Sequence, residues 1–208
     1  KLYKYRDSLH TKTFLEGASG KDEIVRYFSF DENPQAINPE VGYIFSANNQ
    51  PDSISGGLYP GYYMPEDRAK RINEIIETKD NFTKEDVALM LSDVKSSTVE
   101  EVINNIEKAI NIDVLTDFEK RVFAILKQWD GNYYKDNVAP TIYNRFVYEF
   151  LKNTFKDEMG KGFTVFMSKT PLQKKMIAVQ MEKKESVWWD DITTIDKKEK
   201  KEEVVIKS

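Results

Sequence analysis

Two adjacent amides, Asn48 and Asn49, are the residues of this sequence best suited to stabilising a developing negative charge. A side-chain amide donates hydrogen bonds without carrying a charge, which is what a site that binds an oxyanion needs. The amides follow a short apolar run, Tyr43–Ala47, which predicts a buried strand that ends in a turn. Two arginines, Arg68 and Arg71, come later on a predicted helix, where their spacing of three places them on one face. The stretch therefore predicts a strand that carries the amides, a loop, and a helix that brings the arginines back.

A plain turn is the alternative interpretation of the same two amides. Asparagine tolerates left-handed backbone angles and binds its own main chain, so Asn48 and Asn49 also suit a turn with no chemical role. Spacing alone favours this structural interpretation, and it leaves the oxyanion role open.

The composition of the 208 residues excludes several kinds of site. The formal net charge of -4 leaves no basic field for nucleic acid, and no apolar segment approaches the roughly 20 residues that span a bilayer. Cysteine is absent, which rules out disulfides and thiol catalysis. The single histidine, His10, excludes a site with several histidine ligands, and we expect it to be solvent-exposed rather than catalytic. Neither nucleic acid nor a membrane is therefore an expected partner.

Short extended segments are predicted to precede a series of helices. The predicted strands are residues 1–6, 24–30 and 43–47. Three short strands are too few for an isolated sheet to be stable. We expect a mainly α fold of the α+β class, in which residues 1–63 supply strands and loops and residues 64–208 form a helical, bundle-like domain. The strands would then pack on a catalytic core that this chain lacks.

Caps and apolar spacing mark the predicted helices. Threonines 83, 98 and 116 each stand at a predicted helix start, and the last two of them begin capping boxes. Pro65, Pro140 and Thr170 mark further starts. The helix after Pro140 is the most apolar and is the predicted centre of the core. A last, charged helix over residues 196–207 has a poor amphipathic pattern and is expected to fray or to need another segment to pack on.

The triplet Trp129-Asp130-Gly131 resembles a signature motif, but we interpret it as structural. We expect the tryptophan to pack, the aspartate to accept hydrogen bonds from loop N–H groups, and the glycine to adopt a left-handed conformation.

The order and spacing of several short motifs resemble a known family. The motifs are Asn38-Pro39, Gly42-Tyr43-Ile44, Ala47-Asn48-Asn49-Gln50-Pro51, Gly61-Tyr62-Tyr63, Arg68-Ala69, Arg71-Ile72 and Trp129-Asp130-Gly131. Together they resemble the penicillin acylase (penicillin amidase) family of N-terminal nucleophile hydrolases. The similarity extends from about residue 14 to residue 191, which is most of the chain.

The resemblance implies a reaction and two catalytic roles. In that family the first residue of the mature large subunit attacks an amide carbonyl and forms an acyl-enzyme, which water then hydrolyses. Asn48 matches the family's asparagine in the oxyanion hole, and Arg71 matches an arginine that orients the nucleophile and that asparagine. Arg68 is the alternative to Arg71. The chain begins Lys1-Leu2-Tyr3, so by resemblance it is an internal fragment of the large subunit that lacks the nucleophile and is inactive alone.

Substrate and metal expectations also follow from the resemblance. Ala47 matches a position that faces the acyl pocket, and Tyr62 and Tyr63 are candidates to line the cleft. No cofactor is expected. Many relatives hold a structural calcium ion, but residues 56–63 contain no Asp or Glu, so we expect no metal here, although Asp52 could serve in a complete enzyme.

The expected partners are the remaining segments of the same precursor, namely the small subunit and the N-terminal part of the large subunit, together with a small-molecule amide substrate. The resemblance also suggests a periplasmic or secreted location. The competing hypothesis is a non-catalytic helical binding or scaffolding module, in which Asn48 and Arg71 have no shared task.

Overall fold

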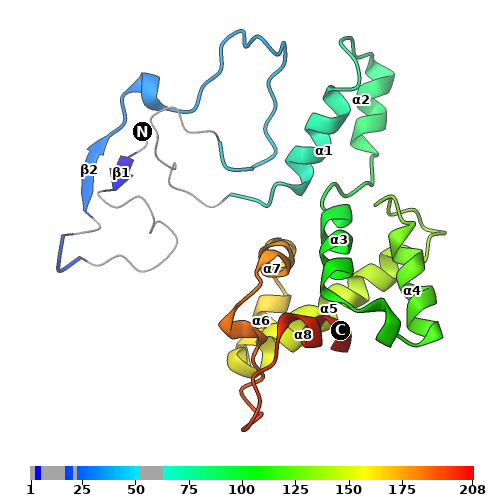
Figure 1. The fold of residues 1–208 in the computed structure, drawn as a ribbon. Coiled ribbons are helices and arrows are strands. Elements are labelled where there is room, and N and C mark those ends of the chain that lie inside the picture. Colours follow the sequence, from blue (N-terminus) through cyan, green and yellow to red (C-terminus); the bar gives the residue numbers. More distant parts are fainter. Residues whose placement is uncertain (1–2, 6–16, 21–22, 52–62) are drawn as a thin grey trace. The chain divides into compact units, whose positions relative to one another are not determined.

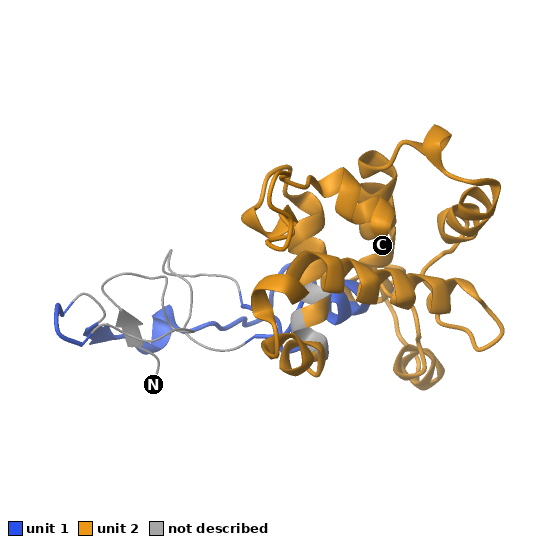
Figure 2. Cartoon of the chain, turned by 90° about the horizontal axis from the view of Figure 1, so that it is seen from below, with its two compact units in different colours: residues 1–72 blue, residues 73–208 orange. Residues whose placement is uncertain are grey.

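A computed structural model of the chain describes residues 3–5, 17–20, 23–51 and 63–208 (Figure 1). Its described part is mainly helical, which confirms the predicted fold class. The chain divides into two compact units, residues 1–72 and 73–208 (Figure 2). The division falls inside helix α1 (Asp67–Ile76), whereas the boundary predicted from the sequence lies between residues 63 and 64.

The first unit contains a two-stranded antiparallel sheet. Strand β1 (Tyr3–Tyr5) pairs with β2 (Ile24–Tyr27), with Tyr3 opposite Tyr27 and an irregularity after Lys4. Both strands fall inside segments that were predicted to be extended. Every residue of β2 is exposed, so the described unit buries neither face of this strand. A short 3-10 turn, η1 (Phe30–Glu32), follows and is held by an ion pair between Arg26 and Glu32.

The prediction of a third strand at Tyr43–Ala47 is wrong. The structure assigns no strand to this segment, and the sheet among the described residues consists of β1 and β2. A strand needs a neighbouring strand to satisfy its backbone groups. Here the Ala47 N–H instead donates to the Asn49 side-chain oxygen at 3.3 Å, and the chain turns at Asn48.

Eight helices follow one another in the described chain (Figure 1). They are α1 (Asp67–Ile76), α2 (Lys84–Leu91), α3 (Val99–Ala109), α4 (Asp117–Lys127), α5 (Ala139–Met159), α6 (Gly162–Met167), α7 (Thr170–Glu182) and α8 (Lys201–Lys207). Two further 3-10 turns are η2 (Ile112–Val114) and η3 (Val187–Trp189). None of the described helices is long and apolar enough to cross a bilayer.

The threonine caps are only partly as predicted. Thr83 and Thr116 each begin a capping box, with Asp86 and Glu119 as the reciprocal side chains. The capping box predicted at Thr98 is wrong, because Thr98 has helical backbone angles and its hydroxyl makes no cap hydrogen bond. A cap residue with extended backbone angles is what lets the hydroxyl reach the N–H groups of the first turn.

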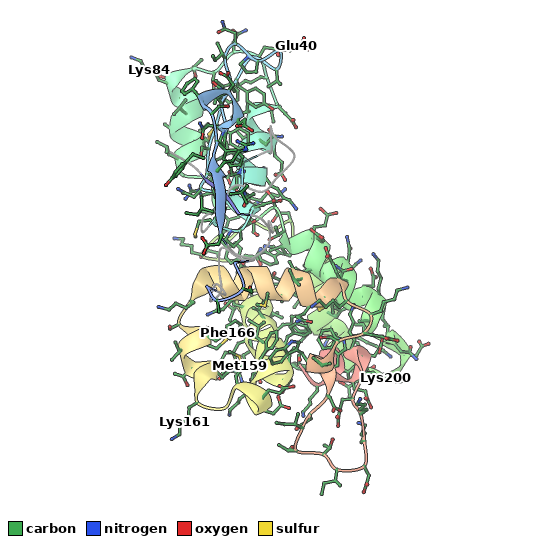
Figure 3. The ribbon with its side chains drawn as sticks, turned by 90° about the vertical axis from the view of Figure 1, so that its left-hand side faces the viewer. Glu40, Lys84, Met159, Lys161, Phe166 and Lys200 are labelled. Atoms are coloured by element: carbon green, nitrogen blue, oxygen red, sulfur yellow. The ribbon has the colours of Figure 1, made fainter. Side chains whose placement is uncertain are left out.

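Helix α5 is the centre of the core of the second unit, as predicted. Phe150 and Leu151 are fully buried, and α5 packs against α4, α6, α7, α8 and η3. The turn between α5 and α6 lies at a corner of this unit, with Lys161 on its outer side (Figure 3). The last helix begins at Lys201, later than predicted, and Val204 and Val205 are buried in the core. Its poor amphipathic pattern therefore did not prevent packing.

The triplet Trp129-Asp130-Gly131 forms a structural clamp, which confirms its interpretation. The Trp129 indole donates to the Asn132 carbonyl oxygen at 2.8 Å, and the Asp130 carboxylate accepts the Asn132 N–H at 3.0 Å. Gly131 has a φ of +83°, and its carbonyl accepts the Ser96 N–H at 3.0 Å. The clamp thus ties the end of α4 to the segment that precedes α3.

Replacing Gly131 tests this clamp. A Cβ atom at Gly131 would lie 2.7 Å from the Ser96 carbonyl oxygen, in a left-handed conformation that strains any other residue. We expect Gly131→Ala to lower the free energy of unfolding by about 2 to 4 kcal/mol. Gly162→Ala is the matched control, because a Cβ atom there would meet no other heavy atom within 4 Å and its φ is not positive. Equal, small effects in urea denaturation would contradict the clamp.

The difference between Thr116, which caps its helix, and Thr98, which does not, gives a second test. Thr116→Ala should lower the free energy of unfolding by about 1 kcal/mol, because the hydroxyl accepts the Glu119 N–H at 3.3 Å. Thr98→Ala removes no cap hydrogen bond and should have a smaller effect. Thermal unfolding of both variants, followed by circular dichroism, makes the comparison. A larger loss at Thr98 would show that the assignment of the caps is wrong.

Candidate functional site

The candidate site lies in the first unit, where Asn48 adopts a left-handed backbone conformation. Its φ is +63°, a region that asparagine tolerates better than most residues. The Asn48 carbonyl oxygen accepts the Met64 N–H at 2.7 Å, which joins this turn to the chain just before α1. The predicted return of the chain is therefore present, although a turn rather than a strand carries the amide.

The side chain of Asn48 meets an arginine of α1. The Arg68 guanidinium donates a hydrogen bond to Asn48 Oδ1 over 2.9 Å. A guanidinium can only donate, so the atom of the amide that faces it must be the oxygen. The Asn48 amide nitrogen, which carries two hydrogen atoms, consequently points elsewhere. Both side chains are in exposed residues, so a molecule from solvent can approach them.

The neighbouring amide of Asn49 has a different task. Its side-chain oxygen accepts the Ala47 N–H at 3.3 Å, and its nitrogen donates to the Gln50 carbonyl oxygen at 3.4 Å. Both contacts are with adjacent main chain, which is ordinary turn chemistry. The two amides of the pair are thus separated by the structure: Asn49 builds the turn, whereas Asn48 contacts a residue that is distant in the sequence.

The first turn of α1 adds an electrostatic field at Asn48 that favours negative charge. Arg68 is the second residue of α1, so the amide that it contacts lies beside the N-terminal turn of that helix. The N–H groups of a first turn and the helix dipole favour negative charge nearby. The Arg68 charge acts in the same direction, while the Asp67 carboxylate in the same turn opposes both. The arrangement can orient a neutral donor toward an anion without burying a charge.

The other predicted site residues have different placements. Arg71 is half-buried, lies three residues further along α1 and takes part in interactions of its own. Its predicted role stays a prediction. Ala47 is buried, with 1% of its surface exposed. Tyr63 is half-buried, directly ahead of the Met64 that binds the Asn48 carbonyl.

Sequence reasoning named Arg71 first and Arg68 second, and the structure places Arg68 at the amide. Both arginines are on one helical face, so spacing could not choose between them. His10, Asp52 and Tyr62 lie outside the described residues, so what was predicted of them stays a prediction. Within the described segments, no group of three or more acidic or histidine side chains is arranged to hold a metal ion.

The whole chain matches one family of known proteins. The family model described as Penicillin amidase matches residues 2–208, which includes both units and the turn at Asn48.

Removing the Arg68 guanidinium tests whether it orients the Asn48 amide. Arg68→Met should change the free energy of unfolding by less than about 1 kcal/mol, because exposed polar contacts contribute little. The two side-chain N–H signals of Asn48 in an NMR spectrum should nevertheless move and lose dispersion. Arg121→Met, at an exposed arginine of α4, is the control and should leave those signals in place. Unchanged Asn48 signals in Arg68→Met would show that the hydrogen bond does not order the amide in solution.

Proposed function

The chain belongs to the penicillin amidase family, and we propose that it is part of an amidohydrolase that cleaves an acyl amide through an acyl-enzyme. Family membership supports hydrolysis of an amide. The specific role that we assign to this chain is to supply Asn48 as a donor to the oxyanion. The observation that carries the proposal is the hydrogen bond from Arg68 to Asn48 Oδ1, since it leaves the N–H groups of the amide for another partner.

The charge that the site would bind appears only during the reaction. When a nucleophile attacks the amide carbonyl, the carbonyl oxygen becomes an oxyanion, and donors aimed at it stabilise the transition state more than the substrate. A donor is effective when it is already oriented, because no reorganisation is then needed at the moment of reaction. Arg68 supplies that orientation because a guanidinium only donates hydrogen bonds and therefore binds Oδ1 rather than the amide nitrogen.

The two arginines have separate proposed tasks. Arg68 positions Asn48 through the contact described above. Arg71 keeps the role implied by the family resemblance, which is to orient the nucleophile, and its half-buried place on α1 is compatible with a fixed geometry. Two guanidinium groups near one site would also favour a neutral amine as the base, because positive charges raise the free energy of protonating it.

The proposal assigns the nucleophile to other segments of the same precursor. The small subunit and the N-terminal part of the large subunit would complete the site, and the isolated chain would be inactive. The substrate is a small-molecule amide. Ala47 directly precedes Asn48, and Tyr63 directly precedes the Met64 that binds the Asn48 carbonyl, so they are the described residues that we propose for the side facing the acyl group. Tyr62 joins them by resemblance.

Substitution of Asn48 in the complete enzyme tests the oxyanion role. Asn48→Ala should lower kcat by about 100- to 1,000-fold with little change in KM, which is the effect of losing one such donor. Asn49→Ala is the matched control, because Asn49 only builds the turn. It should reduce stability while kcat falls by less than about tenfold.

Arg68 variants separate positioning from binding of the oxyanion. Arg68→Lys should keep part of the activity that Arg68→Met loses, because a lysine can still donate to Oδ1 but lacks the planar guanidinium. Full activity of Asn48→Ala in the complete enzyme would remove the catalytic role. A non-catalytic helical binding or scaffolding module would then be the better description of this chain.

A further inference from the structure

Two acidic side chains from separate elements face one cavity in the second unit. Glu158 lies near the end of α5, and Asp190 directly follows η3. Both line a cavity of about 700 Å³, together with Trp188, Glu185, Glu199 and Lys198. The segment that supplies most of this lining joins α7 to α8 and projects away from the helices as a long loop (Figures 1 and 3).

The two carboxyl groups each contain an oxygen atom that is hidden from water. Neither Glu158 Oε2 nor Asp190 Oδ1 has a hydrogen-bond partner among the residues that the structure describes. A buried carboxylate oxygen without a donor is unfavourable, because it has lost its hydrogen bonds to water and no protein hydrogen bond replaces them. A proton on Glu158 relieves this, since the neutral acid can donate to a neighbouring carboxylate.

The surroundings of Glu158 favour that proton. Burial raises the pKa of Glu158 to about 7, and both a hydrogen bond with Asp157 and the charge of Asp190 act in the same direction. The charged groups around it are Asp157 on its own helix, Asp190 after η3, and Glu185, Lys198 and Glu199 on the joining segment. Among these described groups there is one cation and four other acids, so a charge on Glu158 adds to an acidic environment.

Asp157 connects this cluster to the main chain of the loop. Asp157 Oδ2 accepts the Ile192 N–H at 2.9 Å, which ties the loop to α5. Within the loop, the Asp191 N–H donates to Glu199 Oε2 at 3.1 Å. A negative charge on Glu158 would therefore repel both the acid that holds the loop, Asp157, and an acid on the loop itself, Asp190.

We propose that the segment of residues 185–199 is a pH-sensitive latch, which protonated Glu158 keeps closed on α5 and ionised Glu158 releases. The latch is independent of the oxyanion role of Asn48, because it lies in the other unit and uses none of the same residues. It gives the protein a structural response to pH within the physiological range.

The direction of the response follows from linkage. In an open or unfolded chain Glu158 returns toward its ordinary pKa of 4.5, whereas in the closed state its pKa is about 7. Between these two values only the closed state binds the proton, so each rise in pH favours opening. Closure is therefore most favourable below pH 4.5, weakens as the pH rises to about 7, and stays weakened above it.

Amide hydrogen exchange of Ile192 measures the latch. After correction for the intrinsic rate, its protection should fall severalfold, and by no more than about tenfold, between pH 6 and pH 8. Glu158→Gln keeps a donor and cannot ionise, so its protection should stay constant over that range. Glu182→Gln is the control: this exposed acid ends α7 outside the lining of the cavity, and its variant should behave like the unmodified protein.

A second variant keeps the proposal falsifiable if Glu158→Gln folds poorly. Asp190→Asn removes one of the charges that raise the pKa of Glu158, so the midpoint of the loss in protection should move to lower pH. Protection of Ile192 that is independent of pH in the unmodified protein would overturn the latch. The same conclusion would follow if Glu158→Gln and the unmodified protein lost protection equally.

Discussion

The hydrogen bond from the Arg68 guanidinium to Asn48 Oδ1 decides which atoms of that amide remain available to another partner. An exposed contact of this kind contributes little to the free energy of unfolding, and its importance lies in orientation. It is compatible with the left-handed turn at Asn48, which the Met64 N–H holds through the Asn48 carbonyl. One weak interaction thus orients the side chain of a common turn residue.

Rigid helices make such a weak interaction useful. The backbone of Arg68 belongs to the first turn of α1, which limits the positions from which its guanidinium can reach Asn48. In the second unit, rigidity comes from the buried stripe of α5 and from backbone devices at the ends of its neighbours. The close approach of Gly131 to Ser96 and the capping box at Thr116 are examples in which one residue type determines the local path of the chain.

The sequence predicted features that depend on neighbours along the chain and missed those that depend on distant contacts. The threonine cap at Thr83 and the left-handed conformation of Gly131 were predicted because the first has its partner within a few residues and the second depends on the residue type alone. The strand at Tyr43–Ala47 was wrong because apolar character cannot show whether a pairing partner exists. Arg68 could not be separated from Arg71 because the two lie on one face of α1, and only the contact with the distant Asn48 distinguishes them. The sequence gives no local indication that Glu158 and Asp190 line one cavity, since the two belong to α5 and to a distant loop.

The most direct measurement is a crystal structure of the complete enzyme with a stable tetrahedral analogue of the acyl-transfer intermediate. The oxyanion of the analogue should lie about 2.7 to 3.1 Å from Asn48 Nδ2, with the Arg68 guanidinium still bonded to Asn48 Oδ1. An oxyanion bound by other donors, with the Asn48 amide turned away from it, would contradict the assignment of this residue to catalysis.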